Sequence, residues 1–327
     1  MLVLAAALAL ASPSRASDPQ LALPVDCRVG QDCWISEYTD HDPGPGGRDY
    51  RCGPLADDKH GGTDLAISDL ARMRAGVRVL AAADGIVAAT QDGMQDVSVT
   101  EAGVESIKGR SCGNGVVVRH KGGWVTWYCH MKRGSIAVKK GDVVSTGHVL
   151  GMIGLSGMTQ YPHLHFEARR NGERIDPFNG QPVGASCDAP VAPLWREDVL
   201  QALRYRPFTL YNVGLIDTPP DGPMIRNGDA HRTTLGTAAP ALVLWVDSFG
   251  VAKGDEIHFR IIDPEGTVIY ENKKVLKKKY ARWYGYSGRK RRGAAWLAGT
   301  YRGDVTLTRR VGNETISNVI SATVTFE

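Results

Sequence analysis

The sequence predicts an all-β protein in which an antiparallel β domain is followed by an immunoglobulin-like β-sandwich. Short runs of alternating apolar and polar residues recur along most of the chain, separated by glycine, asparagine or aspartate, and this pattern is typical of antiparallel strands. The 38 glycines and 17 prolines favour turn-rich β structure over a helical bundle. At 327 residues the chain is long enough for two domains, since one domain takes about 100–200 residues.

Residues 1–16 are predicted to be a signal peptide. Leu2–Ala11 is an unbroken apolar run with the length of a signal-peptide core, and Ser14-Arg15-Ala16 offers the small residues that cleavage requires. That run is too short to span a bilayer, and no run of eighteen apolar residues occurs elsewhere. We therefore expect an exported protein, periplasmic or secreted, with no transmembrane segment.

Residues 17–54 are predicted to be an N-terminal loop region that carries disulfides. Turn-forming residues crowd positions 40–47. Asp40, His41, Asp42 and Asp49 could form a second metal site or a plug that reaches a metal elsewhere. The glycine- and proline-rich context favours ordinary surface turns instead.

Residues 55–180 are predicted to form the antiparallel β domain. Residues 91–111 within them are polar and contain glycine, so we expect an inserted loop there. Strands are expected at Val77–Ala82, Gly85–Ala89, Val116–His120, Trp124–Cys129, Ile136–Val138, Val149–Ile153 and Leu164–Arg169.

Residues 181–205 are predicted to be a linker, because the stretch 180–193 is rich in small residues and proline. One short helix is expected over residues 195–205. Residues 206–327 contain no cysteine and are predicted to be the sandwich, an accessory domain. Its strands are expected at Phe208–Ile216, Leu242–Val246, Glu256–Ile262, Thr267–Glu271, Gly299–Thr308 and Val319–Phe326.

The six cysteines are expected to form disulfides, because their number is even and none lies in a Cys-x-x-Cys pair that would indicate a zinc ribbon or a redox motif. Disulfides indicate an oxidising compartment, in keeping with export. Fifteen pairings are open to six cysteines. We favour Cys112 with Cys129, which flank a hairpin around residues 121–123. Cys33 with Cys52 and Cys27 with Cys187 would complete the set.

The formal net charge of +4 is too small for this length to indicate a nucleic-acid partner. A basic stretch with interleaved aromatic residues runs over residues 273–292. It could bind an anionic cell-wall or membrane surface, although a solvated face of the sandwich is the favoured interpretation.

Among the nine histidines, His60-Gly61-Gly62-Thr63-Asp64 forms a first ligand pattern. In an extended strand His60 and Asp64 would lie roughly 13 Å apart, too far to share a metal. A tight turn at the paired glycines would bring them together.

The second pattern is His163-Leu164-His165-Phe166-Glu167, in which the two histidines of a strand share one face, about 6.6 Å apart along the chain. One imidazole can bind a metal while the other faces water or substrate; two surface histidines are the alternative. His130, at the end of the hairpin, is a third candidate, although a single histidine in such a place is more often structural.

His60, Asp64 and one histidine of the second pattern would give two nitrogen ligands and one oxygen ligand. Three protein ligands with an open fourth position are typical of a catalytic zinc, one per chain, and cobalt or manganese would also fit these residue types. Such a metal acidifies water and polarises a carbonyl group, as amide hydrolysis requires. The remaining histidines could remove a proton and stabilise an oxyanion. A serine hydrolase is excluded, because Ser156 lacks the second glycine and the following helix of a nucleophile elbow.

Three motifs in this order, His60-Gly61-Gly62-Thr63-Asp64, Tyr128-Cys129-His130-Met131 and His163-Leu164-His165, resemble those of the lysostaphin-type (LytM-type) zinc metallopeptidases. Supporting segments, Ala83–Val87, Gly113–Val117, Val138–Asp142 and Gly154–Gly157, also resemble this family. The resemblance covers roughly residues 55–178. It implies an antiparallel β domain with an open groove, a single zinc and cleavage of peptide cross-bridges in bacterial peptidoglycan.

The resemblance also implies roles for single residues. His60, Asp64 and His165 correspond to zinc ligands, His163 to the catalytic general base, and His130 to the group that stabilises the tetrahedral intermediate. His120 is expected to face His130 in a supporting role. Some members of the family have lost metal ligands and only activate other wall hydrolases, so a non-catalytic activator is the alternative. A metallopeptidase that cleaves proteins is a third reading.

Overall fold

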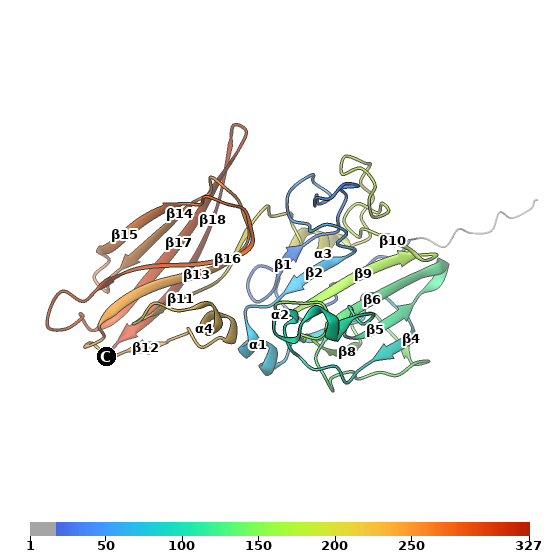
Figure 1. The fold of residues 1–327 in the computed structure, drawn as a ribbon, viewed down its shortest axis with the longest axis horizontal. Helices are drawn as coiled ribbons and strands as arrows, with labels where there is room; N and C mark the ends of the chain where they lie inside the picture. The colour runs from blue at the N-terminus through green and yellow to red at the C-terminus, as the bar shows by residue number, and fades with distance from the viewer. Residues whose placement is uncertain (1–17) are drawn as a thin grey trace, which may run out of the picture.

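The computed structural model describes residues 18–327, so the predicted signal peptide lies outside the described residues. The described chain folds into two β bodies that lie side by side (Figure 1). The apolar core of the first runs from Leu21 to Leu203, and that of the second from Phe208 to Phe326. We call them the N-terminal body and the C-terminal sandwich. Their sheets are largely antiparallel, which confirms the predicted fold class.

One large sheet dominates the N-terminal body, with the strand order β1-β2-β9-β6-β5-β4-β7 and β10 paired with β9. A separate pair, β3 (Arg78–Leu80) and β8 (Val149–Met152), lies beside it. The strands of the large sheet are β1 (Trp34–Glu37), β2 (Thr63–Ala66), β4 (Gly85–Gln91), β5 (Asn114–Arg119), β6 (Trp124–Met131), β7 (Val143–Val144), β9 (His163–Arg170) and β10 (Glu173–Ile175).

The strand predicted at Ile136–Val138 is wrong. In this segment the Ala137 amide donates one hydrogen bond to the Leu150 carbonyl of β8, and one bond does not make a ladder. The predicted hairpin around residues 121–123 is present, because β5 pairs with β6 across a short 3₁₀ turn at Lys121–Gly123.

The C-terminal sandwich consists of two sheets, β11-β13-β16 and β12-β18-β17-β14-β15, whose apolar faces enclose one core. The immunoglobulin-like topology of this body stays a prediction. Its strands are β11 (Thr209–Ile216), β12 (Thr234–Leu235), β13 (Ala241–Val251), β14 (Glu256–Ile262), β15 (Val268–Val275), β16 (Tyr280–Lys290), β17 (Gly299–Val311) and β18 (Glu314–Phe326).

The helices are short: α1 (Leu70–Ala75), α2 (Val99–Ala102), α3 (Glu197–Ala202) and α4 (Gly222–Asn227). α2 lies in the predicted inserted loop, and α3 lies where the linker was expected to contain a helix. Leu194, Trp195, Val199 and Leu203 belong to the core of the N-terminal body, so the end of the predicted linker packs against that body. Among residues 18–327 no helix is both long and apolar enough to cross a membrane.

The disulfides join Cys112 to Cys129, as predicted, but Cys27 to Cys33 and Cys52 to Cys187. The other two predicted pairs are therefore wrong. Residues 184–187 lie beside the loop around residue 40, because the Gly184 amide donates a hydrogen bond to the Asp40 carbonyl. This contact brings Cys187 toward Cys52. Cys27 and Cys33 instead close a local turn.

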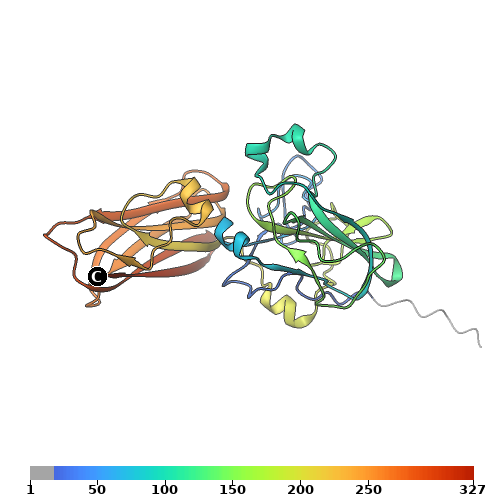
Figure 2. The same ribbon diagram turned by 90° about the horizontal axis from the view of Figure 1, so that it is seen from below.

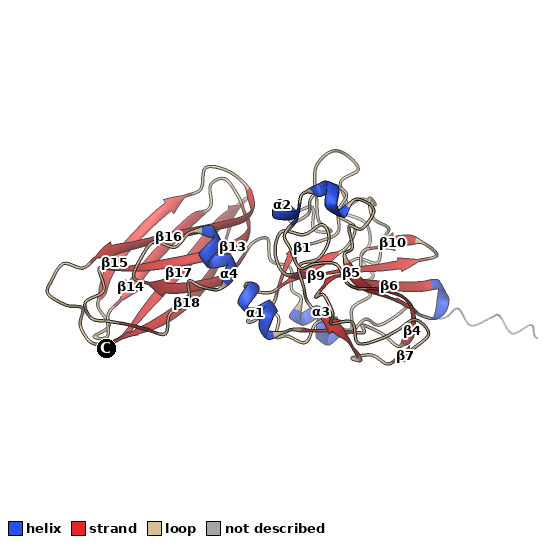
Figure 3. Cartoon of the chain, turned by 60° about the horizontal axis from the view of Figure 1, so that its bottom comes forward, coloured by secondary structure: helices blue, strands red, loops and turns tan. Residues whose placement is uncertain are grey.

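The two bodies meet where α1 approaches α4 (Figures 2 and 3). A Cβ at Gly228 would lie only 2.6 Å from the Cβ of Ala71, so glycine permits this approach. The Asp69 carboxylate accepts a hydrogen bond from the Arg72 amide at the start of α1 and lies 3.5 Å from His231 of the sandwich. The junction is therefore held by both close packing and charge.

Candidate metal centre and active site

His60, Asp64 and His165 meet at one edge of the pair formed by β2 and β9, where Asp64 lies directly opposite His165 in the register. His60 Nε2 is 3.2 Å from Asp64 Oδ1 and 3.1 Å from His165 Nδ1. His165 Nδ1 is 2.8 Å from the same carboxylate oxygen. Three ligand-type atoms, one from each residue, therefore converge, and they lie within 4.8 Å of one another.

The paired glycines let the chain turn between His60 and Asp64. A Cβ at Gly62 would lie 2.5 Å from the Phe166 carbonyl and 2.9 Å from the His165 ring, so any larger residue would displace β9. This close approach sets His60 beside the strand that carries His165. Leu164 and Phe166, on the other face of β9, are fully buried.

Each histidine of the cluster has its second ring nitrogen engaged. His60 Nδ1 donates to the Tyr38 carbonyl at 2.7 Å, and His165 Nε2 donates to Glu167 Oε1 at 3.2 Å. These bonds fix the tautomers, so that His60 Nε2 and His165 Nδ1 are the nitrogens without a proton in the neutral rings. Glu167 is held in turn by the guanidinium groups of Arg169 and Arg174.

Sequence reasoning missed both of these supporting groups. Glu167 lies two residues after His165 on the same strand face, so the alternation that paired His163 with His165 also predicts its position. No sequence signal indicates the Tyr38 carbonyl. A third missed residue is Glu37, whose carboxylate lies 3.9 Å from His60 Nε2; burial and the nearby charges of Asp64 and Asp57 raise its pKa well above the ordinary value.

The electrostatics of the cluster favour a cation. Burial lowers the pKa of His60, but the Asp64 carboxylate and then Glu37 outweigh it and raise that pKa to about 10. The pKa of Asp64 is well below its ordinary value, because its contacts with His163, His60 and His165 outweigh burial. The pKa of Glu167 falls to about 2, since its hydrogen bond to His165 and the nearby arginines overcome burial.

The donor set fits a divalent metal. Two imidazole nitrogens and a carboxylate oxygen suit zinc, and bonds of about 2.0–2.2 Å would place tetrahedral donors roughly 3.3–3.6 Å apart. The observed separations of 2.8–3.2 Å need only a small expansion. In their neutral forms, both rings present an unprotonated nitrogen to the cluster, in the tautomers that their partners impose.

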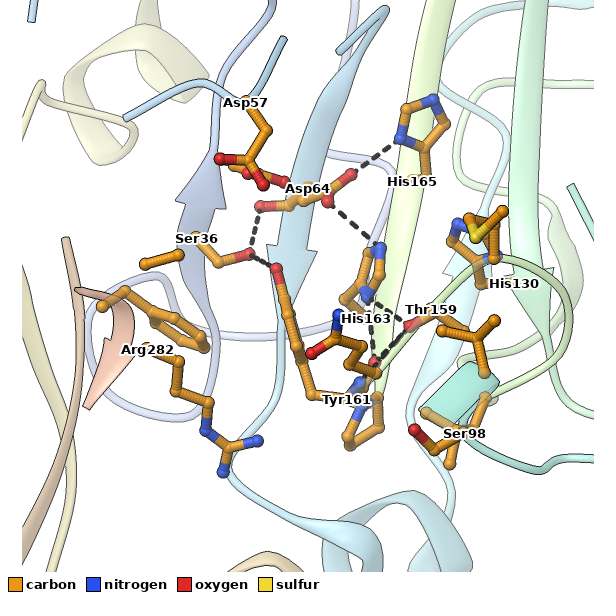
Figure 4. Close-up of a pocket in the computed structure, with 18 of the residues that line it drawn as sticks. Ser36, Asp57, Asp64, Ser98, His130, Thr159, Tyr161, His163, His165 and Arg282 are labelled. Carbon is orange, nitrogen blue, oxygen red and sulfur yellow. Dashed lines mark hydrogen bonds and ion pairs between the residues drawn. The ribbon is translucent and has the colours of Figure 1, made fainter. Parts of the chain in front are cut away.

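His163 lies beside this cluster. Its Nε2 is 3.2 Å from Asp64 Oδ2, and its Nδ1 donates to the Tyr161 carbonyl at 2.9 Å, with Thr159 Oγ1 at 3.2 Å. Nδ1 therefore carries the proton in the neutral ring, and Nε2 is free to accept one. Figure 4 shows His163 and His165 reaching Asp64 from the same strand.

His130 completes the group, with its ring centroid 4.8 Å from that of His163. Its φ of 61° is unusual for a residue with a side chain and costs about 1–2 kcal/mol. The Cys112–Cys129 disulfide, the bond from its amide to the Cys112 carbonyl and the bond from Nδ1 to the Ser156 carbonyl at 2.7 Å hold it there. Burial and the neighbouring histidines lower its pKa well below the ordinary value, so it is neutral with an unprotonated Nε2.

His120 does not face His130, and that expectation is wrong. It lies at the turn end of the β5–β6 hairpin, whereas His130 lies at the opposite end. Its ring bonds to the Asp84 carbonyl at 2.7 Å and to Thr126 Oγ1 at 2.8 Å. The role of His120 is to hold this turn.

The remaining candidates have structural partners. The Asp40 and Asp49 carboxylates accept backbone N–H groups of their own turns, and His41 lies against Asp176 at 2.9 Å. These residues form turns, as predicted, but the turns are buried and not on the surface. The Ser156 hydroxyl is buried and donates to the Met131 carbonyl. It is therefore not a nucleophile.

The histidine cluster lines a groove of about 1370 Å³ that both bodies build. The predicted insertion contributes Ser98 and α2 to its rim, and the C-terminal sandwich contributes Phe249, Arg282 and Tyr284. In Figure 4, Tyr161 lies between His163 and Arg282. The groove is therefore not confined to the body that carries the histidines.

Comparison with known proteins finds relatives of this region. A model of peptidase family M23 matches residues 58–177. The DD-carboxypeptidase/endopeptidase Mpg of Neisseria meningitidis is 41% identical over 85 residues, which are 25% of this chain and 19% of that protein. The peptidoglycan DD-endopeptidase ShyA of Vibrio cholerae is 32% identical over 117 residues, 36% of this chain and 22% of that protein.

Among solved structures, a zinc-containing peptidase from Vibrio cholerae aligns with 49% of this chain and 39% of that chain, at 25% identity and a TM-score of 0.33. This chain spans about a fifth of the length of the curated relatives it matches. The family match contains His60, Asp64, His130, His163 and His165. Residues 58–177, which carry the whole histidine cluster, are therefore similar to peptidase family M23.

Proposed function

We propose that this protein is a zinc-dependent endopeptidase that hydrolyses amide bonds in the peptide stems or cross-links of peptidoglycan. The observation that carries the proposal is the convergence of three ligand-type side chains and two further imidazoles in one groove. Each of the four imidazoles has one ring nitrogen hydrogen-bonded to a fixed partner. In His60, His163 and His165 the other nitrogen lies within 3.2 Å of the Asp64 carboxylate.

His60, Asp64 and His165 would hold the metal, each through the atom that already points at the other two. When bound, zinc supplies a Lewis acid that polarises the scissile carbonyl and acidifies a water molecule. Tyr38 and Glu167 keep the two rings in the tautomers that leave ligand nitrogens free. Such supporting partners are expected to matter nearly as much as the ligands.

His163 acts as the general base. Its Nε2 accepts the proton of the attacking water and returns it to the nitrogen of the leaving amine, while the Tyr161 carbonyl holds the proton on Nδ1. His130 is neutral at rest, so its Nε2 first accepts a hydrogen bond. A proton taken up from solvent then lets Nε2 donate a hydrogen bond to the oxyanion that forms at the carbonyl, and this proton returns to solvent when the tetrahedral intermediate collapses.

The substrate class is supported by the names of the relatives, which are peptidoglycan DD-endopeptidases and a DD-carboxypeptidase/endopeptidase. The scissile bond would be identified by mass spectrometry of the muropeptides released from defined sacculi.

We place the enzyme in the periplasm or outside the cell. Three disulfides support an oxidising compartment. Lys277–Lys279, in the basic stretch 273–292, lie exposed between β15 and β16 and are proposed to contact an anionic wall or membrane surface. Salt-sensitive binding to sacculi would test that contact.

Dye release from purified sacculi, with and without a chelator, tests the proposed activity. Release that a chelator abolishes and added zinc restores would support it. No release at full metal loading would contradict it and favour a non-catalytic activator that recruits another wall hydrolase. Faster cleavage of casein than of sacculi would instead indicate a peptidase for proteins.

A further inference from the structure

Tyr161 fixes the orientation of His163 in two ways. Its carbonyl accepts the hydrogen bond from His163 Nδ1 at 2.9 Å, and its ring lies on the imidazole with the centroids 4.8 Å apart. Without the carbonyl contact, Thr159 Oγ1, at 3.2 Å, is the remaining partner of Nδ1. The direction of His163 Nε2 therefore depends on where Tyr161 lies.

Tyr161 is held in turn by side chains of the C-terminal sandwich. Its ring centroid is 5.3 Å from that of Phe249, and the central guanidinium carbon of Arg282 lies 5.9 Å from it. Its hydroxyl donates to Ser36 Oγ at 3.1 Å. Figure 4 shows Arg282 on the side of Tyr161 that faces away from His163.

Arg282 and Phe249 form a rigid unit. They are partners in the β13–β16 register, and Arg282 Nε donates to Asp247 Oδ2 at 3.1 Å. The guanidinium carbon is also 5.9 Å from the ring of Tyr211, which stacks on Phe249 at 4.3 Å. The guanidinium cation is therefore fixed between the rings of Tyr161 and Tyr211, one from each body. Cation–π attraction stabilises its contact with each ring.

We propose that Arg282 is a positioning residue for His163: from the C-terminal sandwich it holds Tyr161, which holds the imidazole. This inference rests on the proposed function, because it assigns His163 the proton transfer. The metal cluster has separate supports in Tyr38 and Glu167. Loss of Arg282 should therefore reduce turnover and leave metal binding unchanged.

The first test compares Arg282→Gln with Arg289→Gln in the full-length, zinc-loaded protein. Arg289 is a matched control, since it lies on the same strand, is also half-buried and donates to the Ile269 carbonyl at 2.7 Å, outside the groove. With a soluble stem-peptide substrate, we expect kcat to fall about tenfold for Arg282→Gln, because misplacing a catalytic group by about 1 Å can cost 10²-fold and a smaller displacement costs less. KM and bound zinc should stay within twofold of the wild type.

Two further variants separate positioning from folding. Arg282→Gln leaves Asp247 without its partner, so Arg282→Gln/Asp247→Asn removes both charges and should show the same loss of kcat. Arg282→Lys keeps a cation near the Tyr161 ring and should recover kcat to within about threefold of the wild type. An equal fall of kcat in Arg282→Gln and Arg289→Gln would overturn the proposal.

The second test does not depend on activity. Nitrogen-15 NMR of labelled histidines, in the zinc-loaded protein at constant pH, reports the hydrogen bond at His163 Nδ1. Arg282→Gln should shift the His163 ring signals and leave those of His60 and His165 in place, whereas Arg289→Gln should shift none. Unmoved His163 signals would refute the inference, even if the wild type cleaves sacculi. If the wild type cleaves no peptidoglycan, the proposed function fails, and this spectrum still decides the positioning role.

Discussion

The four histidines around Asp64 fall into two pairs that are held by different parts of the molecule. His60 and His165 are oriented by the Tyr38 carbonyl and by Glu167, close to the β2–β9 strand pair. His130 and His163 are oriented by the Ser156 and Tyr161 carbonyls, which lie in the loop between β8 and β9. The first pair thus depends on sheet register, and the second on a loop that the sandwich contacts. Metal binding and turnover should therefore be separable by mutation.

The largest expected effect comes from removing a ligand. His165→Ala deletes one of the three converging donors and should abolish both stoichiometric zinc binding and hydrolysis of sacculi. Elemental analysis after gel filtration measures the zinc. His120→Ala is the control, because His120 is a histidine of the same sheet outside the groove, and it should retain about one zinc per chain. Stoichiometric zinc in His165→Ala would contradict the ligand assignment.

The next largest effect is expected from removing the general base, His163, which belongs to the other pair of histidines. His163→Ala should retain zinc but lose about 10²–10⁴-fold in kcat, the range that a general base contributes. Single-turnover kinetics on a defined muropeptide, with zinc measured on the same sample, would test this. If the variant lost its metal together with its activity, His163 would belong with the ligands.

A smaller effect is expected from the support of a ligand. Glu167→Gln keeps the size of the side chain but weakens its bond to His165, so the dissociation constant for zinc should rise about 10–100-fold. Competition with a chromogenic chelator measures this constant. Glu173→Gln, an exposed change on the neighbouring β10, is the control. Equal affinities in the two variants would remove Glu167 from the metal site.

The smallest effect concerns the junction between the bodies. Asp69→Asn should lower the free energy of unfolding at pH 7 by about 0.5–1 kcal/mol, because the amide keeps the cap but removes the negative charge at the start of α1. The hydrogen bond to His231 and the Arg72 amide overcome burial and lower the pKa of Asp69. The stabilisation by this carboxylate is therefore complete above the unfolded-state pKa of about 4 and is lost as the pH falls through the lower, folded-state value.

Urea denaturation of the metal-free wild type and Asp69→Asn, at pH 7 and at about pH 3, measures this dependence. The difference between the two proteins should shrink at the lower pH. A difference that stays constant would mean that the charge of Asp69 contributes nothing to the junction.

The sequence predicted much of the site because its signals are local. Alternation within His163–Phe166 places both histidines on one strand face, and the hairpin around residues 121–123 brings Cys112 next to Cys129, as found. The glycine pair after His60 indicates the turn that brings His60 to Asp64. Short-range geometry of this kind can be derived from residue spacing.

The features that sequence reasoning missed depend on contacts between distant segments. The loops that contain Cys27 and Cys52 have no hydrophobic periodicity, so nothing local selects their partners. The contact of Arg282 with Tyr161 joins residues of different bodies. β16 is not among the predicted strands, and its sequence is interpreted only as part of a basic stretch on a solvated face. Only the packing of the sandwich against the groove reveals it.

The Cys52–Cys187 bond has one further consequence. It closes a covalent ring that contains His60, Asp64, His130, His163 and His165. If a protease cut the exposed segment around residues 91–111 once, both pieces would remain joined through this bond, and every side chain of the histidine cluster would stay on the same molecule.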